Sequence, residues 1–281
     1  MSPLAFTFAT FLASVLAGVI GSLFGLGGGI VVIPVLTLLL GVDIRYAIGA
    51  SIVSVIATSS GAAAAYVRDR LASLRLSMLL EVSTAAGAIT GALVGGLVDG
   101  RWLFVIFGVV LAYAAVSMLR TAGDASPDPD AGPPDALADR LRLHGTYHDR
   151  PMNRDVRYRV RRSGAGLAIS YVAGVVSGLL GIGGGVIKVP TMNLLMGVPL
   201  KVATATSNLM IGVTAAASAG VYFLRGDINP FVAAPVAAGV LVGATGGSRV
   251  LPRLRNRALR VGFVAVLGWV SVQMIYRGIR G

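Results

Sequence analysis

The chain contains no cysteine and only two histidines among its 281 residues. The lack of cysteine excludes disulfide bridges and thiolate metal sites, and both histidines fall outside the apolar segments. We therefore predict no metal and no cofactor. Charged residues are also scarce, at 13% of the chain against 55% hydrophobic residues. No soluble domain needs that much apolar surface, so the composition predicts an integral membrane protein with several spans.

The few charges are mostly positive, with a formal net charge of +12. In a soluble protein this balance would indicate nucleic acid as a partner. Here the arginines stand between apolar runs, where cytoplasmic loops facing anionic lipid explain them better. We therefore expect a lipid bilayer and no nucleic acid as partner, in a multi-pass protein of the cell membrane.

One ten-residue stretch occurs twice in the chain. Gly25–Pro34 reads GLGGGIVVIP, and Gly181–Pro190 reads GIGGGVIKVP at an offset of 156 (181 minus 25). The same offset, without a gap, continues to pair identical residues across roughly a hundred positions, which chance matching does not explain. The chain is therefore an internal duplication.

Each half contains five apolar segments, and the second one is too short to cross a membrane alone. The segments are 4–24, 30–41, 46–67, 77–98 and 102–119 in the first half, and 165–180, 186–197, 203–224, 231–250 and 259–276 in the second. About 20 helical residues span the hydrocarbon, so most segments suffice. We expect 30–41 and 186–197 to be half-helices or re-entrant segments, with full crossing left open. Leu4–Phe24 is interpreted as a retained membrane helix.

This pattern predicts an all-α integral membrane protein with a membrane repeat at 1–120, a linker at 121–162 and a second repeat at 163–281. Arginines cluster after the third segment of the first half (68–75) and after the fourth segment of the second half (249–260). Because the basic loops swap places, the positive-inside rule favours inverted repeats with both termini outside and a cytoplasmic linker.

The linker combines two kinds of sequence. Gly123–Asp135 is rich in proline and aspartate and has little to bury, so we expect it to be flexible. The alternation at 146–160 predicts a β-hairpin that turns near Pro151–Asn153. His144 and His148 are interpreted as solvated loop residues rather than metal ligands, since no partners stand nearby.

The two glycine runs are the first candidate binding residues. Glycine lets the backbone turn sharply and expose its N–H groups, and the helix that follows presents a partly positive N-terminus. We therefore predict an anion site between two breaks. Its backbone donors are Gly27, Gly28, Gly29, Gly183, Gly184 and Gly185. Lys188 would add a full positive charge there, with a lysine that reaches for the membrane surface as the alternative.

Polar residues at matching positions open the third segment of each half. The candidates for hydrogen bonds to an oxyanion are Ser51, Thr206, Ser207 and Asn208. Asn208 is the strongest, because an amide buried without a partner is costly. Glu81, the single glutamate of the chain, is a candidate for proton coupling, with an interfacial cap as the alternative.

The duplicated glycine motif and the run Ala203–Asn208 resemble the TauE/SafE family of sulfite exporter-like permeases. The resemblance covers both membrane halves and implies a permease for small sulfur-containing anions such as sulfite, sulfonates or thiosulfate. We predict alternating access, with proton coupling, and no enzyme, since the membrane segments lack a Ser/His/Asp set. An anion channel of the same fold is one alternative, and a membrane scaffold acting through the linker is another. Substrate, direction, coupling ion and a homo-oligomeric state stay open.

Overall fold

The structure is a computed structural model that describes residues 2–24, 27–69, 71–120, 135–149, 152–250 and 256–280. The first half comprises α1 (Pro3–Phe24), α2 (Gly29–Pro34), the π-helix η1 (Val35–Leu39), α3 (Ile44–Arg68), α4 (Leu74–Gly95) and α5 (Gly100–Arg120). The linker holds α6 (Ala136–Arg140), β1 (Gly145–Asp149) and β2 (Arg154–Tyr158). The second half comprises α7 (Ser163–Leu180), α8 (Gly185–Pro190), η2 (Thr191–Leu195), α9 (Leu200–Leu224), α10 (Pro230–Val250) and α11 (Asn256–Arg280).

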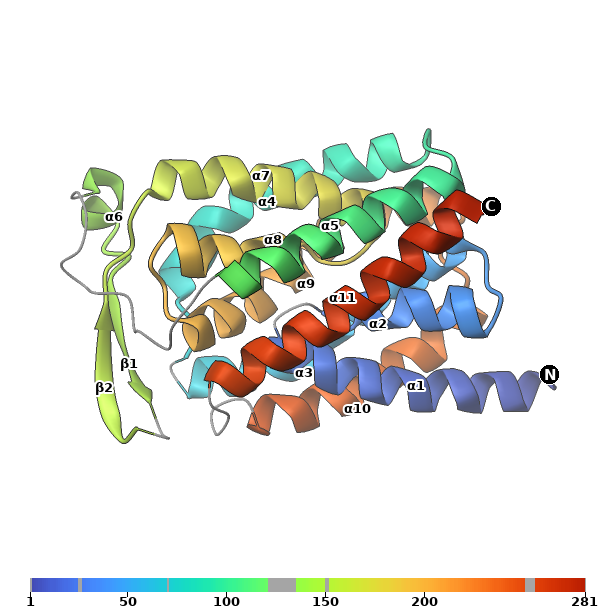
Figure 1. Cartoon of the computed structure of the whole chain (residues 1–281), viewed down its shortest axis with the longest axis horizontal. Helices are drawn as coiled ribbons and strands as arrows, with labels where there is room; N and C mark the ends of the chain where they lie inside the picture. Colours follow the sequence, from blue (N-terminus) through green and yellow to red (C-terminus); the bar gives the residue numbers. More distant parts are fainter. Residues whose placement is uncertain are drawn as a thin grey trace.

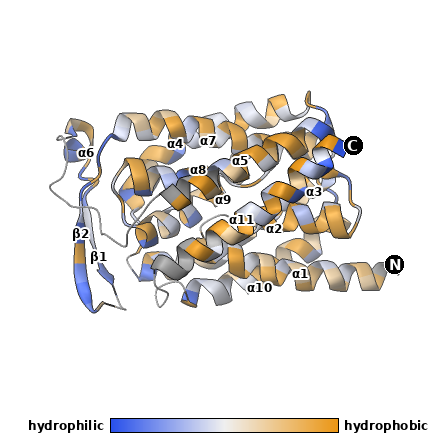
Figure 2. Cartoon of the chain, viewed as in Figure 1, coloured by the Kyte–Doolittle hydropathy of each residue, from blue (hydrophilic) through white to orange (hydrophobic). Residues whose placement is uncertain are grey.

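The predicted class, an all-α multi-pass membrane protein, is confirmed. Six described helices are long and apolar enough to cross a membrane, namely α1, α3, α4, α7, α9 and α10. Figure 2 shows apolar residues along these helices, while the linker hairpin is mostly hydrophilic. The ten segments expected from the sequence are present, and the second segment of each half is short and interrupted.

Local chemistry explains where the short segments begin and end. α7 stops at Gly181, which adopts φ +67°, and Gly183 and Gly184 follow at φ +76° and +73°. A side chain would be strained at three left-handed positions so close together, so the glycine run ends the helix. Pro190 has no N–H for an α-helical bond, and the helix continues in the wider π register, with Met196 N–H donating to Thr191 O.

The two halves interlock through exchanged helices. α1 packs against α10, and α7 packs in the same way against α4. These contacts bring backbones together: a Cβ on Gly91 would lie 2.0 Å from Val175 O, and one on Gly178 would lie 1.9 Å from Ala88 O. The small residues therefore serve close helix packing, as the sequence predicts.

Two packing units result from this exchange. The first unit contains α1, α2, α3 and α10, and the second contains α7, α8, α9 and α4. α3 and α9 join the units at the centre, while α5 and α11 pack on each other. Each unit therefore takes its fourth helix from the other half of the sequence.

Equivalent helices run in opposite directions in Figure 1. α1 leads from the N-terminus towards the middle of the bundle, whereas α7 leaves the linker at the opposite end. Both termini lie at one end of the bundle and the hairpin lies at the other. An inverted repeat requires this arrangement. The inverted repeat itself and the end that faces the cytoplasm stay predictions.

The predicted linker hairpin is present, with β1 and β2 antiparallel between 145 and 158. The proposed turn residue Pro151 lies outside the described residues, as do residues 123–134 of the stretch expected to be flexible. Asp149 in β1 pairs with Lys201 at the start of α9, with 3.0 Å between Oδ1 and Nζ and both side chains only 3% exposed. The hairpin is therefore fastened to the second unit by a buried ion pair.

Two further contacts attach the linker to the second unit. Arg75, in the first turn of α4, donates to Arg142 O, and Arg161 N–H donates to Met196 O at the end of η2. His148 is exposed and contacts Asp155, as expected for a solvated histidine. His144 is half-buried and accepts a hydrogen bond from Val160 N–H. Among the described residues, no group of three potential ligands could hold a metal ion.

Candidate functional site

The two glycine breaks converge on the same pair of side chains. A Cβ on Gly27 would lie 2.7 Å from Ile211 Cδ1 and 3.1 Å from Val55 Cγ1, and one on Gly183 would lie 2.8 Å from Val55 Cγ1 and 2.9 Å from Ile211 Cβ. Val55 on α3 and Ile211 on α9 are equivalent positions of the repeat (211 minus 55 is 156). The breaks therefore meet at the centre of the bundle, and apolar side chains fill the space between them.

Ser51 and Asn208 connect each break to the opposite packing unit. Ser51 Oγ on α3 donates to Gly181 O at 2.6 Å, and Asn208 Nδ2 on α9 donates to Ser22 O at 2.8 Å. Tyr66 OH donates to the same Ser22 carbonyl. In this conformation the predicted oxyanion donors therefore hold the two units together at the ends of α1 and α7.

The other two polar candidates of α9 are buried in different surroundings. Thr206 Oγ1 accepts a hydrogen bond from Ser73 N–H at 3.0 Å, which joins α9 to the loop before α4. Ser207 is fully buried. Asn208 Oδ1 is buried and has no hydrogen-bond partner in the described structure. Asn208 therefore keeps a buried side-chain oxygen near a glycine break that could accept one more hydrogen bond.

The second break offers backbone donors. Gly183, Gly184 and Gly185 are buried, and within the described residues their N–H groups donate no hydrogen bond to the protein. Buried N–H groups without an acceptor are rare in native structures. The first break has fewer free backbone donors among the described residues, because Gly29 N–H donates to Gly27 O. Gly25 and Leu26 lie outside the described residues. The donors predicted at the two breaks are therefore not equally available.

A buried cluster of three side chains lies beside the second break. Lys188 Nζ on α8 donates to Thr214 Oγ1 on α9 at 3.0 Å, and Thr214 Oγ1 donates to Glu81 Oε1 on α4 at 2.7 Å. Lys188 Nζ also lies 3.8 Å from Glu81 Oε2. The Lys188 side chain is 0% exposed and that of Glu81 is 12% exposed. Lysine and glutamate are tolerated at such depth because each compensates the charge of the other.

The geometry of the cluster disagrees with the alternative interpretations of Lys188 and Glu81, while their roles in binding and proton coupling stay predictions. Lys188 does not reach for the surface, since its side chain folds back over the break, with Cε 3.3 Å from a Cβ placed on Gly184. Glu81 lies two turns inside α4 and is buried, so it is not a helix cap. The structure thus brings together the two charges that the sequence singled out separately.

Thr214 is the member of the cluster that sequence reasoning missed. It follows Ser207 by seven residues, or two helical turns, and so lies on the same face of α9 as the predicted polar cluster. A search for polar residues two turns further along the same face of this helix would have identified Thr214.

A groove between α4 and α9 leads to Glu81 from the outside of the bundle. It has a volume of about 550 Å³ and is lined by Leu74, Ser77, Met78, Glu81, Val82, Ala85, Leu209, Met210 and Val213. Its walls are mainly apolar, and Glu81 is its one titratable lining residue. The carboxylate can therefore be approached from the groove, whereas Lys188 is enclosed.

Two like halves, each with a broken helix that meets its counterpart at the centre, define a polytopic membrane transporter. The chain belongs to the family Sulfite exporter TauE/SafE, which matches residues 10–274. The predicted family is thereby confirmed.

Relatives of the chain have consistent names. It is 30% identical to the probable membrane transporter protein YunE of Bacillus subtilis (strain 168), over 94% of this chain and 95% of the relative. It is 26% identical to a probable membrane transporter protein of Xylella fastidiosa (strain Temecula1), over 92% of each chain. The probable membrane transporter protein MJ0441 of Methanocaldococcus jannaschii is 22% identical, again over 92% of each. No solved structure matches the chain.

Proposed function

We propose that the protein is a secondary transporter, not an enzyme, which moves small sulfur-containing oxyanions across the cell membrane by alternating access with proton coupling. The observation that carries this proposal is the cluster at the second break, where Lys188 is buried beside three glycine N–H groups that have no acceptor among the described residues. A buried cation next to directional N–H donors has the chemistry that recognises an oxyanion.

Charge balance suggests how protons are coupled. Lys188 is compensated by Glu81 in this conformation, so an arriving anion would make the site negative by one charge. If Glu81 takes up a proton, its charge disappears and the ammonium is left for the anion. Site neutrality then requires one proton for each monovalent anion, moving in the same direction. The Glu81 carboxylate is 12% exposed at the groove, whereas Lys188 is enclosed, so Glu81 is the member of the pair better placed to exchange a proton.

The packing units suggest what moves. Ser51 and Asn208 each reach from one unit to the end of a helix in the other, and Val55 and Ile211 fill the space between the breaks. Rocking of the units would break these two hydrogen bonds and open the centre to one side at a time. Lys188, Thr214 and Glu81 all belong to the second unit, so the charge cluster would move as one body.

Transport in proteoliposomes tests the proposal. Vesicles containing the purified protein would be offered sulfite, thiosulfate and a short alkanesulfonate, with an internal dye reporting pH. We expect saturable uptake of at least one of these anions, with proton movement in the same direction. Conductance without saturable counterflow would make the protein a channel of this fold. Absence of any sulfur-oxyanion flux, in protein that exchanges another anion, would refute the substrate class.

A further inference from the structure

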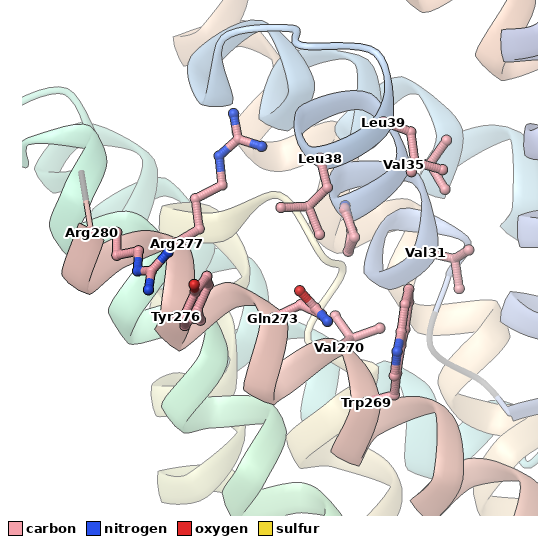
Figure 3. A pocket seen from close by; sticks show the side chains of 11 residues that line it. Val31, Val35, Leu38, Leu39, Trp269, Val270, Gln273, Tyr276, Arg277 and Arg280 are labelled. Carbon is pink, nitrogen blue, oxygen red and sulfur yellow. The ribbon is translucent and has the colours of Figure 1, made fainter.

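A second cavity lies between α2–η1 and α11, and the proposed transport cluster does not contribute to it. Its volume is about 510 Å³, within the range of sites that hold small ligands. It is lined by Val31, Pro34, Val35, Leu38, Leu39, Trp269, Val270, Gln273, Tyr276, Arg277 and Arg280. Figure 3 shows these side chains.

The α11 residues of the cavity form one helical face. Positions 269, 270, 273, 276, 277 and 280 follow the spacing of three and four residues that aligns side chains along a helix. The opposite face packs on α5, where Ser271 donates to Gly108 O and a Cβ on Gly278 would lie 3.1 Å from Arg101 O. Most of the aromatic and basic face is therefore turned towards the cavity, although the Arg277 guanidinium also lies over the Phe104 ring of α5, 5.6 Å from its centre.

The cavity has one charged end and one apolar end. Arg277 and Arg280 lie at one end in Figure 3, Gln273 lies between, and Trp269 faces Val31 at the other end. Arg277 donates to Thr37 O at 2.5 Å, and Arg280 stacks over Tyr276 with its guanidinium 4.3 Å from the ring centre. Within the described part of the chain, neither arginine forms a salt bridge with a carboxylate. An occupant that complements both ends is an anion with an apolar chain.

The surroundings of the cavity favour a lipid as that occupant. The side chains at its mouth are strongly exposed, with Leu39 at 75% and Trp269 at 62%, on the outer surface of a bundle of membrane helices. Tryptophan, tyrosine and arginine are typical of the boundary between hydrocarbon and water. The arginines are near the C-terminus, at the end of the bundle opposite the hairpin (Figure 1).

We propose that this cavity binds an anionic glycerophospholipid. The phosphate lies at Arg277 and Arg280, and one acyl chain follows Val31, Val35 and Trp269. Because Val31 and Val35 belong to the short segment after the first glycine break, the bound lipid braces the broken helix from outside the bundle. The inference is independent of the substrate proposed above.

Lipid binding to the purified full chain tests this proposal, with phosphatidylglycerol as the probe and phosphatidylcholine as the zwitterionic comparison. Native mass spectrometry in detergent would count retained lipids during titration. We expect phosphatidylglycerol to bind at least about tenfold more tightly, the value of one charge-assisted hydrogen bond. Arg280→Gln should remove most of that preference without unfolding the protein, because Arg280 is exposed and makes no described hydrogen bond to the fold.

Two more variants separate the site from a general charge effect. Val35→Trp should displace the acyl chain and lower phosphatidylglycerol binding while both arginines stay in place. Arg45→Gln removes another exposed charge, at the start of α3 and outside the cavity lining, and should leave binding unchanged. Equal binding of the two lipids, or an Arg280→Gln protein that keeps the preference, would overturn the proposal. Competition by glycerol phosphate at the same concentration as the lipid would also overturn it, since the site would then recognise a soluble anion.

Discussion

Replacement of Lys188 by methionine probes the charge cluster directly. Lys188 Nζ and Glu81 Oε2 are 3.8 Å apart, and at an effective dielectric near 20 their attraction is about 4 kcal/mol. Methionine keeps the length of the side chain and removes this attraction, which leaves Glu81 buried without its cation. Breaking a buried pair in this way typically costs about 3–5 kcal/mol of stability. If Lys188 had no contact with Glu81, replacing it by a neutral side chain would not be expected to lower the stability of a membrane protein.

The double variant separates stability from transport. Lys188→Met with Glu81→Gln removes both charges, so we expect it to regain most of the thermal stability lost in Lys188→Met. It should still bind the anion about one to three orders of magnitude more weakly, the range for losing a charge-assisted hydrogen bond. The assays are thermal unfolding in detergent and the concentration dependence of anion uptake in proteoliposomes.

Glu81→Gln alone provides the matched comparison. It keeps Lys188 and Thr214 but removes the proton acceptor, so anion exchange should continue while proton movement is lost. A folded double variant that transports with unchanged apparent affinity would show that the anion binds elsewhere. A Glu81→Gln protein with normal proton movement would remove Glu81 from the coupling mechanism.

Three further predictions concern topology, packing and the linker. Cysteines introduced at Ser73 and His148 should label only from the cytoplasm, and one at Ile228 only from outside. Since Ser73 and Asn229 are equivalent in the repeat (229 minus 73 is 156), labelling of Ser73 and Ile228 from one side would indicate parallel repeats. Gly91→Ala should sharply lower thermal stability in detergent, because its Cβ would lie 2.0 Å from Val175 O. Gly95→Ala, whose Cβ would lie 3.4 Å from Leu179 O, should leave the stability nearly unchanged. Equal effects of the two variants would contradict the packing argument. Lys201→Met should lower stability by about 3–5 kcal/mol and speed proteolysis of the hairpin, because Asp149 stays buried without its partner. Asp149→Asn added to Lys201→Met should restore most of that loss, and no restoration would mean that Lys201 acts by packing alone.

Local chemistry made much of the fold predictable. Three consecutive glycines inside apolar sequence disfavour a continuous helix, so the breaks at 27–29 and 183–185 could be predicted from the sequence alone. The same holds for the short second segments, the alternating hairpin and the closely packed small residues. Helix exchange between the halves was not predictable, because it depends on which apolar faces meet in space.

The candidate site was predictable only in part, for the same reason. Lys188 and Glu81 are 107 residues apart (188 minus 81), and nothing local relates them. Each was singled out by the cost of burying one charge, while their contact requires α4 to pack within the unit of the second half. Ser51 and Asn208 were identified as hydrogen-bonding residues, but their partners are the carbonyls of opposite helix ends.

Both halves of the duplicated chain contain the helices that surround the candidate site, but only one copy of each position carries a charge. The repeat equivalents of Lys188 and Glu81 are Val32 and Ala237, since 188 minus 32 and 237 minus 81 are both 156. Only Thr214 has a like counterpart, Thr58, whose hydroxyl donates to its own helix at Ser54 O. An anion held by Lys188 would thus stay with the second packing unit while the apolar first unit moves against it. In the proposed mechanism, the second unit would carry the anion, and the first unit would open and close the route to it from each side of the membrane.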